Sequence, residues 1–145
     1  MTPPISKRLF DIIEALPLRG GMRILEIGCG TGVAAREIAS RFDDIYIMGI
    51  DRSAKAIAQA RKNCKTAISA GKINFIQAAI ETLPPCSSDE PFDLAFAIRV
   101  GALDGRHPEA ELPALKIIAR MLKPGGMLYV DGAATLKTVD IDAYR

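Results

Sequence analysis

The residues with the most specific chemical potential follow two apolar runs of this chain, 22–27 and 45–50. The first run leads into residues 28–32, which read Gly-Cys-Gly-Thr-Gly, and the second is followed by Asp51. Glycine tolerates positive φ and has no Cβ, so such a turn lets a ligand lie directly against the backbone. The helix expected to follow would offer unpaired N–H groups and a partial positive charge to an anion. Because Asp51 could accept hydrogen bonds from ribose hydroxyls, the pattern predicts a nucleoside-bearing ligand.

Five apolar runs and the stretches between them must position these residues. The runs lie at 22–27, 45–50, 73–77, 94–98 and 127–130. Most of them do not alternate polar with apolar residues, which is typical of parallel strands covered on both faces. Stretches with helical spacing or capping signals lie at 5–16, 33–42, 54–69 and 112–122. Pro113 suits the last of these only if it lies in the first turn.

The alternation of strands and helices predicts an α/β fold. We expect a doubly wound, mainly parallel sheet of about five strands with helices on both faces, binding its ligand beyond the carboxyl ends of the strands. The length of 145 residues suits one domain. We expect a helix at 4–16, a core at 22–132 and a short tail at 133–145.

Composition excludes several classes of protein. The chain has 49% hydrophobic residues, which suits a folded protein, and its net charge of +2 is too balanced for a nucleic-acid binder. Cys29, Cys64 and Cys86 form no CxxC pair and are odd in number, which favours a reducing cytoplasm. No apolar stretch suits a signal peptide or reaches membrane-spanning length, so we expect neither secretion by that route nor membrane insertion.

Four segments together resemble the class I S-adenosylmethionine-dependent methyltransferases, and most of all the small-molecule methyltransferases of the ubiquinone/menaquinone-biosynthesis type. These segments are 24–32, 49–51, 92–98 and 122–130, and the likeness covers roughly residues 5–132. It implies an enzyme that binds S-adenosyl-L-methionine, transfers its methyl group to a small-molecule acceptor by in-line displacement, and leaves S-adenosyl-L-homocysteine. The acceptor itself cannot be read from the sequence.

The resemblance also implies roles for individual residues. Gly28 and Gly30 would lie along the methionine portion of the cofactor, and Glu26 would organise the loop and approach the amino group. Asp51 would hold the ribose hydroxyls, and Arg52 would flank the adenine. The cofactor-binding set implied in this way is Glu26, Gly28, Cys29, Gly30, Gly32, Asp51, Arg52, Ala79, Ile80 and Ala97. We expect no metal site, because no cluster of ligating residues stands out.

Other positions leave their roles open. Ala79 stands where similar proteins often carry an acid that accepts from the adenine amino group, although the N–H of Ile80 could still meet a ring nitrogen. Glu81 could replace that acid only if its loop turns inward, and we expect it to be solvated instead. Arg99 either orients an anionic acceptor or is solvated at the end of a strand. His107, the only histidine, could act as a general base or simply be exposed.

Two rival functions are weighed against methyl transfer. Ala79 and the short C-terminus are also consistent with an alternative function, a catalytically weak cofactor-binding or interaction module of the same fold. An NAD(P)-dependent oxidoreductase is disfavoured because Val33 stands at the third glycine of GxGxxG, although Arg52 could meet a 2′-phosphate. DNA adenine methylation is disfavoured because an Asn-Pro-Pro-Tyr type of motif is absent after the fourth apolar run.

The short C-terminus leads to two further expectations. Residues 133–145 are too few for the helix and hairpin that similar proteins add, so the fifth strand is expected to be an exposed edge that a homodimer could cover. The acceptor pocket is then expected to be open, completed by a partner, or absent from this chain.

Overall fold

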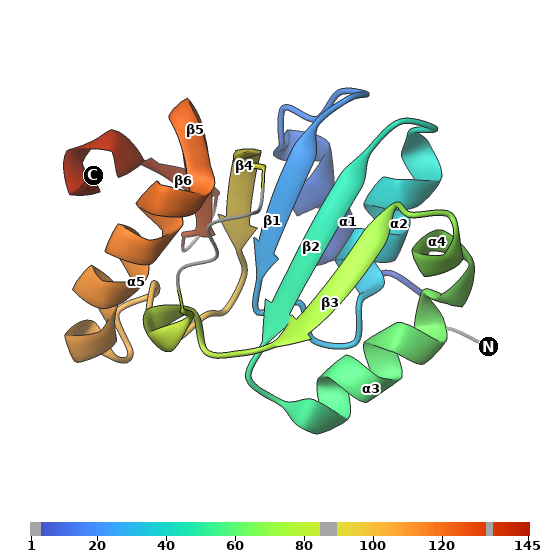
Figure 1. Cartoon of the computed structure of the whole chain (residues 1–145), viewed down its shortest axis with the longest axis horizontal. Coiled ribbons are helices and arrows are strands. Elements are labelled where there is room, and N and C mark those ends of the chain that lie inside the picture. Colours follow the sequence, from blue (N-terminus) through green and yellow to red (C-terminus); the bar gives the residue numbers. More distant parts are fainter. Residues whose placement is uncertain (1–3, 85–89, 133–134) are drawn as a thin grey trace.

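The computed structural model describes residues 4–84, 90–132 and 135–145 of the chain. The strands are β1 (Arg23–Ile27), β2 (Tyr46–Asp51), β3 (Ile73–Gln77), β4 (Phe92–Ala97), β5 (Leu122–Asp131) and β6 (Leu136–Val139). The α-helices are α1 (Lys7–Ala15), α2 (Val33–Arg41), α3 (Ala54–Asn63), α4 (Lys65–Ser69) and α5 (Pro108–Met121), and two 3-10 helices are η1 (Ile80–Thr82) and η2 (Ile141–Tyr144). Strands and helices alternate along most of the chain, as predicted (Figure 1). Cys86 and most of the loop at 83–91 lie outside the described residues.

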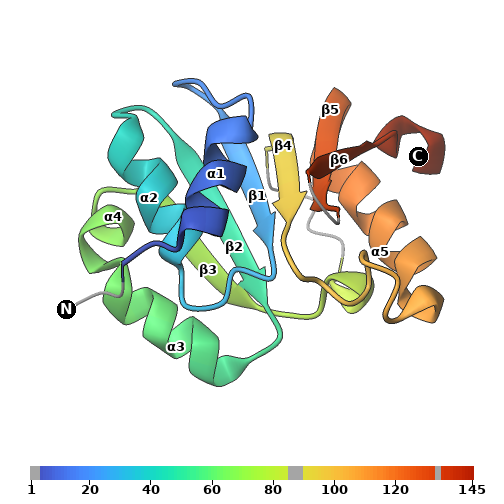
Figure 2. The same ribbon diagram turned by 180° about the vertical axis from the view of Figure 1, so that it is seen from behind.

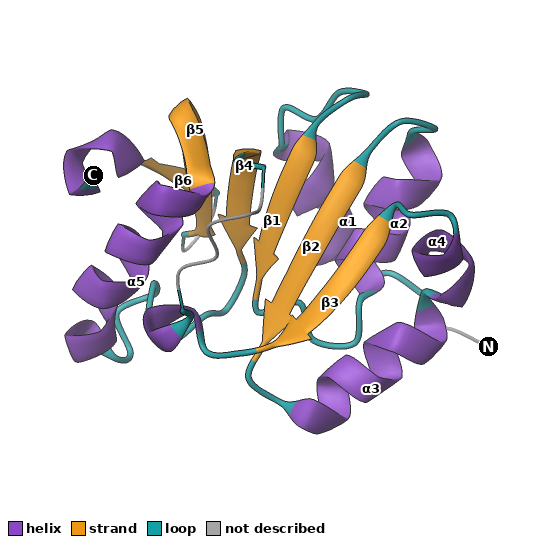
Figure 3. Cartoon of the chain, viewed as in Figure 1, coloured by secondary structure: helices purple, strands orange, loops and turns teal. Residues whose placement is uncertain are grey.

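The sheet has the order β3-β2-β1-β4-β5-β6. Strands β1 to β5 are parallel, and the order reverses between β1 and β4. In such sheets the loops at the carboxyl ends of the strands form a crevice at the reversal point. Figure 3 shows the arrowheads of β1 to β4 pointing to one edge, where these loops gather. The predicted doubly wound α/β architecture is therefore confirmed.

Helices cover both faces of the sheet. Helices α1, α2 and α3 bury Ile13, Ile38 and Ile57 against one face, and α5 buries Leu115 and Ile118 against the other. Figure 2 shows α1 and α2 in front of the sheet, on the side opposite to the view of Figure 1. None of the helices in the described ranges is long and apolar enough to cross a membrane.

The end of the chain differs from the expectation of an exposed fifth strand. β6 pairs antiparallel with β5, and Gly132 donates its N–H to the carbonyl of Thr135. η2 then packs on α5 and β5, with Ile141 almost fully buried. The sheet thus has six strands where about five were expected, and residues 136–144 form β6 and η2. The expectation that β5 is the exposed edge, which a homodimer could cover, is therefore wrong, because β6 of the same chain pairs with β5.

Two helices also differ from their predicted form. The helix expected over 54–69 breaks at Cys64, whose φ of −114° and ψ of 23° are not helical, so that the stretch forms α3 and α4. Helix α5 begins earlier than predicted, with Pro108 in its first turn. Pro113 therefore lies inside this helix and not in the first turn, on its exposed side where water can reach the carbonyl that loses its partner.

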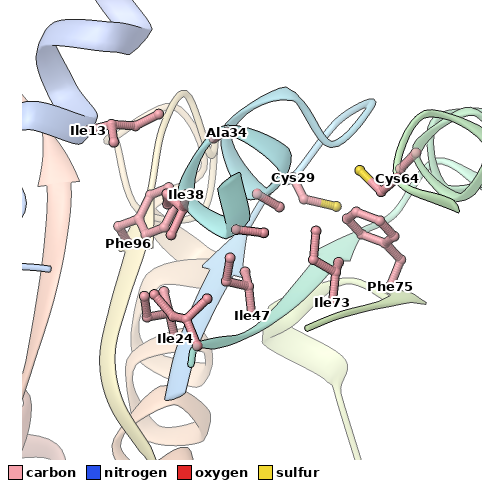
Figure 4. Close-up of a cluster of buried hydrophobic side chains, with 14 of the residues drawn as sticks. Ile13, Ile24, Cys29, Ala34, Ile38, Ile47, Cys64, Ile73, Phe75 and Phe96 are labelled. Atoms are coloured by element: carbon pink, nitrogen blue, oxygen red, sulfur yellow. The ribbon is translucent and has the colours of Figure 1, made fainter. Parts of the chain in front are cut away.

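The core beneath the glycine-rich loop is packed closely. Figure 4 shows Cys29 and Cys64 beside the ring of Phe75, among side chains from β1, β2, β3, α2 and the loop. A Cβ at Gly49 would lie 2.7 Å from this ring and 2.9 Å from the Cβ of Cys29. Gly49 therefore lets Phe75 and the loop approach β2, and this contact fixes the loop from below.

Candidate functional site

A cavity of about 400 Å³ opens at the carboxyl ends of β1, β2, β3 and β4. Gly28 and Asp51 line its middle, Arg52 and Ala79 line one end, and Arg99 and other residues after β4 line the other end. The cavity lies where the strand order reverses, which is the position expected for a ligand in this type of sheet. The other lining residues are Ile27, Ile50, Ala78, Ile80, Glu81, Val100, Gly101, Ala102, Arg106, His107, Glu109 and Ala110.

The loop between β1 and α2 depends on glycine at three positions. Gly28, Gly30 and Gly32 have φ of 75°, 54° and 84°, which side chains rarely adopt. A Cβ at Gly28 would lie 2.7 Å from Cγ2 of Val100, whereas a Cβ at Gly30 would meet no protein atom within 4 Å. Gly30 thus leaves open space above the loop, and Gly28 lets the segment after β4 approach.

Asp51 ties this loop to the end of β2. Its Oδ2 accepts the N–H of Gly30 at 2.9 Å, and its Oδ1 accepts the N–H of Ser53 at 2.9 Å. Ser53 in turn caps α3 by accepting the N–H of Ala56. The Asp51 carboxylate therefore holds the glycine-rich loop in place. The same residue is the one that the sequence analysis expected to bind ribose hydroxyls.

Glu26 lies on β1 beneath the loop and is the buried charged residue of the described chain, with 5% of its surface exposed. Its Oε1 has no hydrogen-bond partner among the described residues. Burial raises the pKa of this carboxyl to about 8, and the negative charge of Asp51 adds to the rise. Because an unpaired buried carboxyl oxygen is costly, this oxygen suits a hydrogen-bond donor or a cation brought by a ligand.

At the β2 and β3 end of the cavity, Arg52 and Glu81 form an ion pair at 3.1 Å. Glu81 is 20% exposed in its side chain and lines the cavity, so the expectation of a solvated loop glutamate is wrong. The reason is η1, which turns Glu81 toward Arg52. Ala79 and Ile80 line the same end, and Ala79 presents no polar side-chain atom there.

At the β4 end of the cavity, Arg99, Arg106 and His107 provide cationic or titratable groups. Arg106 donates to the Asp104 carboxylate and to the carbonyl of Arg99, the latter at 2.7 Å. The N–H of Arg99 donates to Oδ1 of Asp131 at 3.0 Å. His107 is 57% exposed and its ring packs against Gly101. The structure thus brings Arg99 and His107, both singled out from the sequence, to one rim.

The sequence-predicted cofactor residues divide into those that line the cavity, those buried beneath it, and two further glycines of the loop. Those that line the cavity are Gly28, Asp51, Arg52, Ala79 and Ile80. Glu26, Cys29 and Ala97 are buried beneath it, and the side chain of Ala97 packs in the core with α5. Gly30 belongs to the loop above Glu26, and Gly32 borders a second hollow between α2 and the N-terminal segment. No group of three or more potential metal ligands gathers within the described part of the chain.

Two residues of the site were missed from the sequence. Asp131 ends the fifth strand, so the rule that singled out Asp51 could have found it. Arg106 carried no such signal, because only the folded loop after β4 brings it back to the carbonyl of Arg99.

Comparisons with known proteins agree with this geometry. Residues 24–126 match a family model described as a methyltransferase domain. The O-methyltransferase rstn1 of Aspergillus nomiae is 38% identical over 120 residues, which cover 83% of this chain and 50% of that protein. The chain belongs to the class I S-adenosylmethionine-dependent methyltransferase family, and the resemblance noted in the sequence is confirmed.

Solved structures that are similar to this chain include a cyclase and a methyltransferase. The [4+2]-cyclase SpnF is 35% identical with a TM-score of 0.67, and the match covers 85% of this chain and 43% of that one. A methyltransferase from Thiobacillus denitrificans in complex with S-adenosyl-L-homocysteine is 27% identical with a TM-score of 0.67, covering 87% and 48%. This chain therefore spans about half the length of the proteins that it matches.

Proposed function

We propose that this chain binds S-adenosyl-L-methionine in the cavity above Asp51 and serves methyl transfer to a small-molecule acceptor. The observation that carries the proposal is the glycine-rich loop, held over the buried Glu26 by the bond from Gly30 to Asp51. The relative named an O-methyltransferase and the similar structure solved with S-adenosyl-L-homocysteine support the proposal.

The residues present fit an adenosyl amino acid. The open space at Gly30 accommodates a group lying against the backbone, and the unpaired Oε1 of Glu26 suits a cationic ammonium group. Asp51 uses each oxygen for one backbone N–H, and carboxylate oxygens retain further lone pairs for ribose hydroxyls. The paired Arg52 and Glu81 would border the nucleoside end.

When bound, S-adenosyl-L-methionine supplies a methyl group on a sulfonium, open to in-line displacement by an acceptor nucleophile. The chain would contribute mainly by holding the reactants in line and by excluding water. His107 lines the cavity, and its imidazole is a group that can accept a proton from an acceptor. An acceptor that is already a good nucleophile would need no such base.

Calorimetric titration with S-adenosyl-L-homocysteine tests the binding step, with a matched pair of glycines as variants. Gly30→Ala and Gly71→Ala both place a side chain at positive φ, and neither new Cβ meets a protein atom within 4 Å. Their losses of stability should be similar, about 1–2 kcal/mol. Only Gly30→Ala should weaken binding, by more than tenfold. Equal affinities in both variants, or binding of NAD(H) alone, would overturn the cofactor assignment.

A labelled-methyl transfer screen across metabolite extracts then tests the reaction. A labelled product that forms with the wild-type chain and not with Asp51→Ala supports methyl transfer. Because a similar structure is named a [4+2]-cyclase, the same fold also occurs in a protein named for another reaction. Tight binding of the cofactor with no labelled product from any extract would instead favour the cofactor-binding module.

We also propose a reducing compartment such as the cytoplasm. Cys29 and Cys64 are both buried free thiols, and neither is paired in the structure. Intact free thiols in protein isolated from its native compartment would support this location.

A further inference from the structure

The backbone of Arg99 is held in an unusual conformation. Its φ of 57° makes it the one non-glycine residue in the left-handed region among the described residues. Residues with a side chain rarely adopt this conformation, and it persists only where the surroundings impose it. Here the surroundings do so on both sides, because Asp131 accepts the N–H of Arg99 and Arg106 donates to its carbonyl.

The guanidinium of Arg99 is also the unpaired cation of the cavity. Arg52 pairs with Glu81, Arg106 pairs with Asp104, and the His107 ring lies 3.7 Å from Glu109. No ion pair or hydrogen bond joins the guanidinium of Arg99 to another side chain in the described ranges.

The acid that accepts the backbone N–H of Arg99 also binds a second residue. Asp131 accepts the N–H of Arg99 with Oδ1 and a guanidinium N–H of Arg8 with Oδ2 at 3.1 Å. Its two oxygens therefore fix the backbone of Arg99 and the start of α1, and neither forms an ion pair with the Arg99 side chain. An arginine that only needed solvation would not require a strained backbone held by two other side chains.

The position of Arg99 suits the acceptor rather than the nucleoside. A Cβ at Gly28 would lie 3.8 Å from the carbonyl of Ile98 and 2.7 Å from Val100, so the segment carrying Arg99 runs beside the glycine-rich loop. Arg52 and Ala79 border the opposite end of the same cavity. A cation at the β4 end would thus face a second molecule placed next to the group bound along the loop.

We infer that Arg99 binds an oxyanion of the acceptor, so that the acceptor is a small molecule carrying a carboxylate. Asp131 and Arg106 act as positioning residues that hold Arg99 toward the cavity. The planar guanidinium can donate two parallel hydrogen bonds to a carboxylate, which supplies orientation as well as charge. This inference rests on the proposed function, because it identifies the cavity as the acceptor site of a methyl transfer.

The test uses benzoate and benzamide, which have similar shape and differ in charge, as probes at constant ionic strength. Each is titrated into the S-adenosyl-L-homocysteine-saturated protein and into the ligand-free protein, followed by NMR amide shifts around residues 99–107. The wild-type protein should bind benzoate at least tenfold more tightly than benzamide. Arg99→Asn should remove this preference, and asparagine is chosen because it tolerates the left-handed conformation. Arg99→Lys should retain part of it.

Arg120→Gln serves as the matched control, because Arg120 is an exposed arginine near the end of α5 and does not line the cavity. It should leave the preference for benzoate unchanged. A preference that survives Arg99→Asn, or that is absent from the wild type, would overturn the inference.

A third measurement separates the acceptor from the cofactor. Arg99→Asn should change the Kd for S-adenosyl-L-homocysteine by less than twofold, and a loss above tenfold would mean that Arg99 serves the cofactor's own carboxylate, contrary to the inference. If S-adenosyl-L-homocysteine does not bind at all, the proposed function fails. Arg99-dependent binding of benzoate to the ligand-free protein would in that case still support an oxyanion site.

Discussion

The amide of Gly30 donates a 2.9 Å hydrogen bond to the carboxylate of Asp51 and so connects the glycine-rich loop after β1 to the end of β2. The other oxygen of the same carboxylate accepts the N–H of Ser53, at the start of α3. One side chain therefore sets the relative positions of the glycine-rich loop and the helix that follows β2. Asp51, which is expected to bind the ligand, therefore also positions the loop against which the ligand would lie.

Replacing Asp51 should consequently affect stability and binding together. Asp51→Ala leaves two backbone N–H groups without their partner, which should cost about 1–3 kcal/mol of unfolding free energy. Its affinity for S-adenosyl-L-homocysteine should fall by more than tenfold. Asp51→Asn keeps one carbonyl oxygen as an acceptor and should lie between the wild type and Asp51→Ala in both measurements. Urea unfolding and calorimetric titration provide the two values.

Ser53→Ala is the control for this prediction. It removes the cap of α3, in which the Ser53 hydroxyl accepts the N–H of Ala56, and should cost about 1 kcal/mol. Its affinity for S-adenosyl-L-homocysteine should stay within twofold of the wild type. A similar loss of affinity in Ser53→Ala would mean that loosening α3 alone explains the effect of Asp51→Ala.

Gly49→Ala should destabilise the protein although Gly49 has no positive φ. The added Cβ would approach Phe75 to 2.7 Å and the Cβ of Cys29 to 2.9 Å, so β2 or the loop must shift. Overpacking of this kind costs about 1–3 kcal/mol. The loss should be partly relieved in Gly49→Ala/Phe75→Leu, as measured by thermal unfolding.

Gly20→Ala is the comparison for Gly49→Ala, since its new Cβ would lie 3.7 Å from the carbonyl of Asp44, an ordinary contact. Its stability should change by less than about 0.5 kcal/mol. Equal effects at the two positions would contradict the role assigned to the Phe75 contact.

The thiols of Cys29 and Cys64 should be unreactive in the folded protein. Burial raises the pKa of both, that of Cys64 to about 11, and only a thiolate reacts rapidly with a maleimide. In a Cys86→Ser background, labelling at pH 7.5 should be negligible without denaturant, and two thiols should react after unfolding in urea. Rapid labelling of the native protein would show that the loop over Cys29 opens readily.

Much of the fold follows from local patterns that the sequence displays directly. The apolar runs predicted the strands β1 to β4 to within two residues at each end, because a strand buried on both faces needs a continuous apolar stretch. β6 was missed because Leu136–Val139 is only four residues long and its two central residues, Lys137 and Thr138, are polar and exposed, as residues of an edge strand can be. Its pairing depends on the tertiary position of β5, which no local pattern records.

The two sides of the site also differ in how far they could be predicted from the sequence. The glycine-rich loop and Asp51 could be located because strand, turn and helix follow one another directly in the sequence. Glu81 could not be placed from the sequence, because its inward turn depends on η1 and on Arg52, some 30 residues away along the chain. The left-handed backbone of Arg99 depends likewise on Asp131 and Arg106, and no local pattern in the sequence pairs either residue with it.

Glu26→Gln should change how stability depends on pH. Burial raises the pKa of Glu26 from an ordinary 4.5 to about 8, so the folded state holds this proton more tightly than the unfolded state. The stability that the protein gains because folded Glu26 binds its proton more tightly is complete below the unfolded-state pKa of Glu26. It is lost as pH rises through the folded-state pKa of Glu26, by at most about 1.4 kcal/mol per pH unit.

The neutral amide of Glu26→Gln cannot ionise, so its stability relative to the wild type should increase steadily from pH 5 to pH 8 in urea unfolding at fixed ionic strength. Asp93, Asp104 and Asp142 are present in both proteins, and their lowered pKa values act only at more acidic pH, so they cancel in the difference. Parallel pH profiles for the two proteins would mean that Glu26 is ionised in the fold at neutral pH. In that case water or another polar group must already stabilise the carboxylate, and the description of Oε1 as an unpaired buried oxygen would be wrong.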